Sequence, residues 1–388
     1  MSWLRVVIFL ALVSAILFGM HYYLWLRLVR DTGIGEPWRA IASGGLVLLG
    51  ATMLAAFPLM RFAPRRFTSP MMWVAYTWMG LAFFTLALLG VGELIKLGAR
   101  LASRASGFDL ERRRPLAHLI ATAAAGGAAG LSAWSARNAT LGAVETKRVR
   151  IALARLPQSL SGYRIAQITD LHVGPTIGRA YVEEIVQRVN ALQPNLVAVT
   201  GDLVDGSVEQ LGPLVEPIAQ LKAPDGAFFV TGNHEYFVPG LERWLRFLKK
   251  RGLRVLRNER VPIRGSEGFD LAGIDDLTAK SYGRGHGADL PRALAGRDTA
   301  RAIVLLAHQP RQVKDAVAFG VDLQLSGHTH GGQIFPFTLL VRLFEPYLAG
   351  LFKLGQTQLY VSRGTGYWGP PMRLGAPAEI TLIELVSA

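Results

Sequence analysis

Cysteine is absent from the 388 residues of this chain. Its absence excludes a disulfide framework, a thiolate metal site and a cysteine nucleophile. Charged residues are scarce at 18%, whereas 51% of the residues are hydrophobic. The net charge is +14, yet no dense run of lysine and arginine interleaved with aromatic residues follows the hydrophobic part. We therefore expect no nucleic-acid partner, because arginine clusters beside membrane spans explain the positive charge more economically.

The hydrophobic excess lies in residues 1–136, which we interpret as an all-α membrane region of about four transmembrane helices. Three runs have the roughly 20 residues that a helix needs to cross a bilayer. A fourth is weaker because it consists largely of alanine and glycine. The candidate spans are 6–26, 40–60, 71–92 and 116–134. The alternatives are buried core helices for the first three and a peripheral helix for the fourth.

Basic residues beside these spans bear on their orientation. The loops between spans one and two and between spans three and four carry nine lysine and arginine residues. This excess predicts that these loops are cytoplasmic, which places the large domain on the extracytoplasmic side of a bacterial-type cell membrane. The string "ERRRPLAHLI" before the fourth span also resembles a twin-arginine export signal, so cleavage of that span stays an alternative to its retention.

Residues 137–160 are predicted to form a linker and a first strand, and residues 161–388 a globular domain that can bury its own core. Short apolar runs alternate here with helical patterns. Strands are predicted at 163–169, 196–200 and 227–231, and helices over 180–192, 208–222 and 241–251. Buried strands joined through helices are typical of parallel pairing in an α/β fold.

Polar residues stand at the ends of the predicted strands. The segments are "ITDLHVG", "TGDLVDG", "TGNHEY", "LAHQP" and "SGHTHGG". They contain Asp170, His172, Asp202, Asn233, His234, His308, His328 and His330. Because the carboxyl ends of parallel strands face one crevice, we expect these side chains to converge there.

The converging side chains suit two divalent cations. Carboxylate, neutral imidazole and one amide oxygen form a ligand set typical of Mn, Fe or Zn. A carboxylate can bridge two ions, and Asp202 is central in the order of the motifs. Two ions about 3.5–4 Å apart would hold a hydroxide and clamp a phosphate for in-line attack. Glycines at 201, 232, 327 and 331 allow sharp turns close to the ions.

These five ordered segments resemble the calcineurin-like metallophosphoesterase superfamily over about residues 147–388. With "SRGTGYW" near the end, the chain is similar to the membrane-associated branch that includes bacterial phosphodiesterases of the YkuE and YaeI type. The resemblance implies a four-layer αββα sandwich and a metal-dependent hydrolase acting on phosphoric ester or anhydride bonds.

The resemblance also implies roles for individual residues. Asp170, His172 and His330 would bind one metal ion. Asn233, His308 and His328 would bind the other, and Asp202 would be shared between them. His234 would lie beside the metals and act as a general acid on the leaving group or as a hydrogen-bond donor to the phosphoryl oxygen.

Other charged residues near the motifs are candidates for supporting roles. Asp205 and Glu235 could hold metal ligands, and Arg363 could contact the substrate phosphate. Asp275 and Asp276 could line the rim of the site. The alternative for all five is an ordinary loop or surface residue.

Residues 334–355, rich in phenylalanine and leucine, bear on the substrate. They form either a helix packed on the core or an apolar flap that touches the bilayer or accepts an acyl chain. The flap favours a phospholipid or a lipid-linked nucleotide-sugar such as UDP-diacylglucosamine as the substrate. Two alternatives stay open: a phosphomonoesterase or protein phosphatase with the same site, and a non-catalytic metal-binding membrane sensor. The native metal and the oligomeric state are left open.

Overall fold

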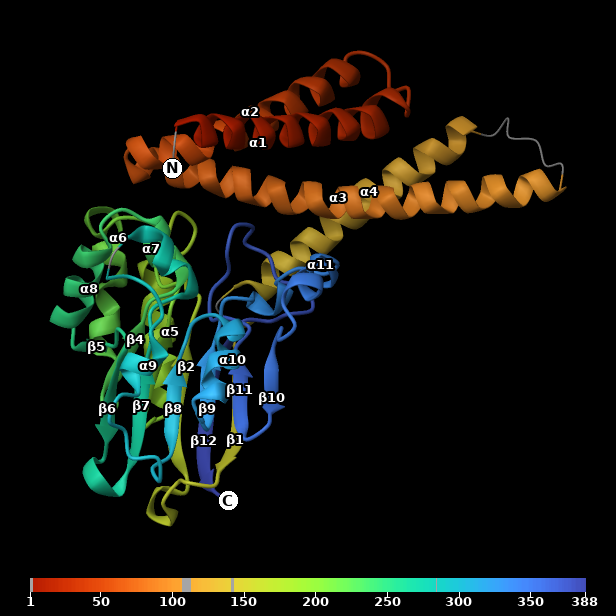
Figure 1. Cartoon of the computed structure of the whole chain (residues 1–388). Coiled ribbons are helices and arrows are strands. Elements are labelled where there is room, and N and C mark those ends of the chain that lie inside the picture. The colour runs from red at the N-terminus through yellow and green to blue at the C-terminus, as the bar shows by residue number, and fades with distance from the viewer. Residues whose placement is uncertain (1–2, 107–112, 141–142, 284) are drawn as a thin grey trace. The chain divides into compact units, whose positions relative to one another are not determined.

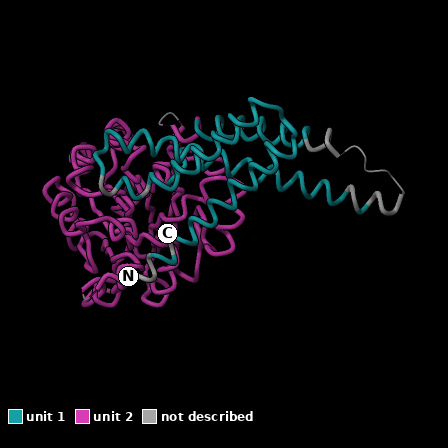
Figure 2. The backbone as a smooth tube through the Cα atoms, turned by 90° about the horizontal axis from the view of Figure 1, so that it is seen from above, with its two compact units in different colours: residues 1–136, 369–371 teal, residues 137–368, 372–388 magenta. Residues whose placement is uncertain are grey.

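The computed structural model describes residues 3–106, 113–140, 143–283 and 285–388. The chain divides into two compact units, which Figure 2 distinguishes. Residues 1–136 and 369–371 form the first unit, and residues 137–368 and 372–388 form the second.

The first unit consists of long helices. They are α1 (Trp3–Trp25) with the π-helical η1 (Leu26–Arg30), α2 (Trp38–Phe62), α3 (Arg65–Ser106) and α4 (Arg113–Asn138). Four stretches in them are long and apolar enough to cross a membrane: Leu10–Arg30, Trp38–Met60, Arg65–Gly98 and His118–Asn138. The prediction of about four spans is confirmed. The helix α3 exceeds its predicted span because backbone hydrogen bonds continue a helix through charged residues, where the hydropathy signal stops.

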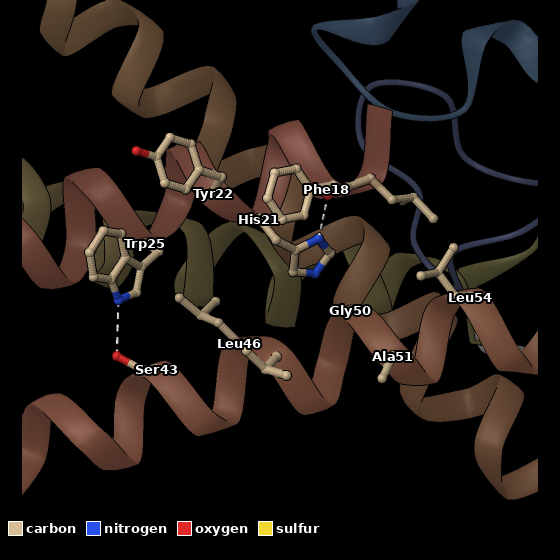
Figure 3. A pocket seen from close by; sticks show the side chains of 11 residues that line it. Phe18, His21, Tyr22, Trp25, Ser43, Leu46, Gly50, Ala51 and Leu54 are labelled. Carbon is tan, nitrogen blue, oxygen red and sulfur yellow. Dashed lines mark hydrogen bonds between the residues drawn. The ribbon is translucent and has the colours of Figure 1, made fainter. Parts of the chain in front are cut away.

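Figure 3 shows an apolar hollow of about 460 Å³ between α1 and α2. His21 lines it, and both of its ring nitrogens have partners. Nδ1 donates to the Leu17 carbonyl at 2.8 Å, and Nε2 accepts from Trp78 at 2.9 Å. This histidine is therefore a structural residue of the helix bundle.

Two six-stranded sheets form the second unit (Figure 1). The first has the order β1 (Glu145–Leu153), β12 (Glu379–Ser387), β2 (Tyr163–Ile168), β3 (Leu196–Thr200), β4 (Ala227–Val230) and β5 (Leu253–Val255). The second has the order β10 (Gly350–Leu354), β11 (Thr357–Val361), β9 (Leu323–Ser326), β8 (Ile303–Leu306), β7 (Phe269–Gly273) and β6 (Glu259–Ile263).

The second unit also contains helices, several of which cover the outer faces of the sheets. The longer ones are α5 (Arg179–Ala191), α6 (Val208–Val215), α8 (Leu241–Lys250), α10 (Val313–Ala318) and α11 (Phe337–Phe344), with short α7 (Asn233–Phe237) and α9 (Leu290–Ala293). The 3₁₀ turns are η3 (Gln158–Leu160), η4 (Glu216–Gln220), η5 (Gly265–Glu267), η6 (Leu277–Tyr282), η7 (Pro310–Gln312) and η8 (His330–Gly332).

Three buried clusters define the layers. Val197 and Val199 of β3 pack with α5, α6 and α8, whereas Leu196 and Ala198 of the same strand pack toward the second sheet. Ile303 of β8 packs with α9 and α10 in the third cluster. Successive side chains of a strand point to opposite faces, so both faces of each sheet are apolar. The predicted four-layer αββα sandwich is confirmed.

Strand direction decides where the loops gather. The strands β2, β3 and β4 are parallel neighbours in one sheet, and β7, β8 and β9 are parallel neighbours in the other. Their carboxyl ends therefore form one edge of the sandwich. We call this the metal-site edge, because all the motifs follow these strands.

Candidate metal centre

The metal-site edge brings the predicted ligands together from both sheets. Asp170 and Asp202 follow β2 and β3, and Asn233 begins α7 after β4. From the other sheet, His308 follows β8, and His328 and His330 follow β9. Asp170, Asp202 and His308 are buried to at least 98%. Residues up to 160 positions apart in sequence thus share one buried site.

The backbone of the ligand loops is unusual. Asp170, His172, Asp202, His328 and His330 all have positive φ, between 49° and 71°. Residues other than glycine rarely adopt this left-handed conformation, and it costs about 1–3 kcal/mol at each position. Strain of this kind is concentrated at functional sites, where it aims side chains that regular backbone would direct elsewhere.

One cluster of ligand atoms comes from Asp170, His172 and His330, which all lie within 4.8 Å of one another. The Nε2 atoms of His172 and His330 are 3.0 Å apart. Burial and the neighbouring His172 lower the pKa of His330 well below its usual value, so its ring is neutral at pH 7. Neutral imidazole is the form that binds a cation.

A second cluster comes from Asp202, His308 and His328. The Nε2 atom of His308 is 3.1 Å from Asp202 Oδ2 and 3.2 Å from Asn233 Oδ1. Asp202 Oδ2 also lies 3.8 Å from His172 Nε2, so its carboxylate stands between the two clusters. This is the position that a bridging ligand requires.

The hydrogen bonds around the clusters test whether cations fit. His308 Nδ1 faces the Thr200 carbonyl at 2.8 Å, and His172 Nδ1 faces Asp205 Oδ1 at 3.0 Å. Both partners only accept, so each Nδ1 carries a proton and each Nε2 faces the cluster, where its lone pair could bind a cation. Converging lone pairs repel one another unless a positive charge lies among them. The residues therefore fit two divalent cations.

The charges of the second cluster are consistent with this fit. Burial opposes ionisation of Asp202, but His308, His234 and His172 outweigh it and hold the pKa of this carboxyl well below its usual value. Burial likewise opposes the charged form of His308, yet the Asp202 carboxylate raises its pKa well above the usual value. A divalent cation would replace the proton of His308 as the partner of Asp202.

His234 lies beside the two clusters and forms a third group of possible ligand atoms with His172 and Asp205. Its Nδ1 donates to Asp205 Oδ1 at 2.7 Å, and the same oxygen accepts from His172. Burial disfavours the charged ring, but Asp202 and Asp205 raise the pKa of His234 to about 9. The ring is therefore protonated at pH 7, which is the state that a general acid needs.

Comparison with known proteins agrees with this geometry. The calcineurin-like phosphoesterase family matches residues 163–332. A zebrafish (Danio rerio) transmembrane protein with metallophosphoesterase domain is 36% identical over 401 residues, covering 98% of this chain and 89% of that protein. This chain belongs to the calcineurin-like phosphoesterase family. It is a metal-dependent phosphoester hydrolase, and the predicted family is confirmed.

Bacterial relatives of this phosphoesterase match a shorter part of the chain. An uncharacterized metallophosphoesterase of Helicobacter pylori is 42% identical over 242 residues, covering 62% of this chain and 63% of that protein. The metallophosphoesterase YkuE of Bacillus subtilis is 28% identical over 252 residues, covering 63% of this chain and 86% of that protein. The family normally uses divalent metals, in agreement with the ligand clusters.

Glu235 of the phosphoesterase holds two ligand loops together. Its buried carboxylate accepts hydrogen bonds from the backbone amides of Asp202 at 3.0 Å, Leu203 at 2.8 Å and Gly232 at 2.7 Å. These contacts tie the loop after β3 to the start of α7. The supporting role predicted for Glu235 thus has a structural basis, as does that of Asp205.

Three further candidates are held by other contacts. The guanidinium of Arg363 pairs with Glu379 at 2.6 Å and Glu145 at 2.7 Å, and the substrate contact considered for it stays a prediction. Asp275 and Asp276 were considered as rim residues, but both are fully buried. Asp275 pairs with Arg257, and Asp276 accepts from Gln309. Sequence could not predict these contacts, because the partner residues are distant along the chain.

Arg373 supports the metal site, although it lies outside the ligand motifs. Its fully buried guanidinium donates to the carbonyls of His330, Arg363 and Ala376 at 2.8–3.3 Å and to Gly366. One of its nitrogens also lies 3.3 Å from His330 Nδ1. The residue thereby holds the turn that carries His330. The only sequence signal is an arginine in a short apolar and glycine-rich segment.

Two exposed aromatic side chains flank His234. The ring of Phe237 lies 5.4 Å from the imidazole and that of Trp368 lies 6.0 Å from it, centroid to centroid. Gln333 fixes the backbone of Trp368 through two hydrogen bonds of 2.8 and 3.0 Å. More than half of each aromatic side chain is exposed. An incoming substrate therefore meets apolar surface beside the general-acid candidate.

Proposed function

We propose that this membrane phosphoesterase uses two divalent cations to hydrolyse a phosphodiester or pyrophosphate bond in a lipid or lipid-linked substrate. The observation that carries the proposal is the Asp202 carboxylate, which stands between two clusters of converging lone pairs. A single-metal site has no need for such a shared ligand.

In this proposal Asp170, His172 and His330 hold one cation, and Asn233, His308 and His328 hold the other. Asp202 contributes to both. The donor set of carboxylate, imidazole and amide suits Mn, Fe or Zn. The cations, when bound, would supply an activated water and neutralise charge on the phosphoryl oxygens.

His234 provides the proton for the leaving group. Asp205 accepts from its Nδ1, which fixes the ring and leaves Nε2 for a substrate oxygen. Despite burial, Asp202 and Asp205 raise the pKa of His234 to about 9, which favours the protonated ring that a general acid needs. Asp205 also orients His172, so one carboxylate aligns the acid with a metal ligand.

Apolar surface beside the site supports a lipid or lipid-linked substrate, for which UDP-diacylglucosamine is a suitable test compound. Phe237 and Trp368 flank His234, and several leucine and phenylalanine side chains of segment 334–355 are exposed. A protein phosphatase would be favoured by a basic rim with that segment buried. The exposure of these side chains supports a lipid or lipid-linked substrate over a phosphoprotein.

We also propose that the second unit faces the extracytoplasmic side of a bacterial-type cell membrane. Support comes from the excess of basic residues in the loops between spans one and two and between spans three and four.

The test uses the full chain in nanodiscs with Mn²⁺ and two soluble substrates, bis-p-nitrophenyl phosphate and p-nitrophenyl phosphate. We expect hydrolysis of the diester and a loss of about 100-fold or more in Asp202→Asn, because the shared ligand loses its charge. Hydrolysis of the monoester alone would favour the phosphatase alternative. Bound metal with no turnover of either substrate, or of a lipid-borne diester, would favour the sensor.

A further inference from the structure

The helix α11 turns its apolar side outward. None of its eight residues is buried, and Leu339, Leu340, Leu343 and Phe344 are exposed, Leu343 by 77%. The less exposed positions are Thr338 and Val341. A helix on a soluble protein normally points its apolar stripe at the core, and helices that lie in a membrane interface do the opposite.

Hydrogen bonds hold α11 in place beside a metal-ligand turn. The amide of Thr338 donates to the Ile334 carbonyl at 3.2 Å, and that of Phe335 donates to Leu374 at 2.9 Å. At the other end, Glu345 pairs with Arg311 at 2.9 Å. The helix begins seven residues after His330. Its outward face is therefore a defined surface beside the metal site, fixed at both ends.

The chain enters the phosphoesterase unit at this same edge. In the first sheet Thr381 of β12 pairs with Gln167 of β2, which puts Glu379 level with Thr169, one residue before Asp170. Glu145 of β1 in turn pairs with Glu379. Since β1 and β12 are parallel, the first residue of the unit's first strand lies at the metal-site edge.

The connection to the last candidate span is short. That span ends at Asn138, and β1 begins at Glu145. Seven residue steps can extend no more than about 25 Å. Ala139 and Val144, at the two ends of the connection, are buried in the core of the phosphoesterase unit, which shortens the usable length further. Along the chain, the point of entry at the metal-site edge is therefore within about 25 Å of the end of the candidate span.

We infer that the metal-site edge faces the bilayer and that the apolar face of α11 lies in its interfacial layer. Lipid is the occupant of this face. The short connection to the last candidate span brings the metal-site edge to the membrane, and α11 presents exposed leucine and phenylalanine there beside an exposed arginine, Arg342. The consequence for catalysis rests on the function proposed above. A phosphate group at the membrane surface would reach the metal centre without leaving the bilayer.

The absence of cysteine makes a direct test simple. Leu343→Cys in the full chain is labelled with an environment-sensitive fluorophore and placed in nanodiscs that hold one copy each. The nanodiscs contain phosphatidylcholine, phosphatidylglycerol and a nitroxide-labelled phosphatidylcholine. Glu267→Cys is the matched control, because it is exposed in η5 at the opposite edge, before β7.

We expect the nitroxide lipid to quench the label at position 343 several-fold more than the label at position 267. Equal, weak quenching at both positions would overturn the inference, because the face of α11 would then be in water. A second copy of the chain cannot produce the expected result, since each nanodisc holds one copy and the quencher is carried by lipid. This readout needs no catalytic activity, so it is independent of the proposed function.

A second variant tests the consequence for the substrate. Leu343→Glu places a charge in the interfacial face while leaving the metal ligands untouched. We expect hydrolysis of UDP-diacylglucosamine in a phosphatidylcholine and phosphatidylglycerol bilayer to fall about tenfold. Soluble bis-p-nitrophenyl phosphate should be hydrolysed as by the unmodified chain. Equal losses on both substrates would overturn the surface role, and no turnover of either substrate by the unmodified chain would instead contradict the proposed function.

Discussion

Asp205 links a metal ligand to the candidate general acid through a single oxygen atom. Its Oδ1 accepts from His172 at 3.0 Å and from His234 at 2.7 Å. Although burial opposes its ionisation, the two imidazoles hold the pKa of this carboxyl below its usual value. The carboxylate therefore remains charged throughout the physiological pH range. Its charge acts on both the metal ligand His172 and the candidate general acid His234.

The Asp205 carboxylate influences how the activity depends on pH, because it sets part of the pKa of His234. His234 acts in its protonated form, so activity is present below its pKa, which Asp202 and Asp205 raise above the usual value despite burial, and is lost as the pH rises through that pKa. Bound cations will lower this pKa, and the comparison is therefore made at equal metal loading. Asp205→Asn removes a negative charge, which lowers the pKa of His234 further and moves the alkaline limb to lower pH.

Profiles of kcat/KM against pH, measured with the soluble diester, test this prediction. We expect the variant to lose about 10²-fold at neutral pH, the typical contribution of a general acid. Asp225→Asn is a suitable control because Asp225 pairs with Arg264 and Tyr163, away from the metal ligands. An alkaline limb unchanged by Asp205→Asn would exclude His234 as the group that titrates.

At the scale of elements, the turn between β4 and α7 has no room for a side chain. A Cβ atom added at Gly232 would lie 2.2 Å from Asp202 Oδ1 and 2.5 Å from the Asp202 amide nitrogen. The same glycine donates its own amide to Glu235. The close approach of this turn to the loop after β3 is what puts Asn233 and Asp202 beside one another.

Gly232→Ala is therefore expected to displace the Asp202 carboxylate and to weaken metal binding by about 10–100-fold, the range seen when support for a ligand is lost. Metal content after dialysis of the full chain against limiting Mn²⁺ measures this. Gly178→Ala is the matched control, because Gly178 has extended backbone and nothing lies within 4 Å of its added Cβ. Equal metal retention in the two variants would show that the turn tolerates the methyl group.

At the scale of the whole molecule, the two units should respond differently to metal removal. The ligands belong to the phosphoesterase unit, and their converging lone pairs repel one another without cations. Each cation at 100 to 1,000 times its Kd stabilises that unit by about 2.7–4.1 kcal/mol. A chelator should remove this stabilisation from the second unit and leave the helices of the first unchanged.

Hydrogen exchange on the full chain in nanodiscs can separate the two units. After chelation we expect faster amide exchange in the loops at 170–172, 202–205 and 328–332 and in the strands that carry them, with α2 as the internal reference. Asp202→Asn should respond little to the chelator because it binds metal poorly from the start. Similar acceleration in α2 would mean that stabilisation by metal is not confined to the phosphoesterase unit.

The sequence was sufficient to predict the features that depend on short stretches of consecutive residues. The four apolar helices follow from runs of roughly 20 residues, and the predicted strands at 163–169, 196–200 and 227–231 overlap β2, β3 and β4. The ligand motifs could be found because each is a short string of polar residues at the end of an apolar strand. Sequence also excluded every cysteine-based chemistry.

Only the tertiary structure decided the contacts between distant segments. It pairs Arg363 with Glu145 and Asp275 with Arg257, and it buries Arg373 under the turn of His330. It also places Glu145 level with Thr169, one residue before Asp170, so that the start of β1 and the metal site share one edge. Strand order and register set these relations, and no local pattern of residues contains them, because each depends on which strands become neighbours when the two sheets pack.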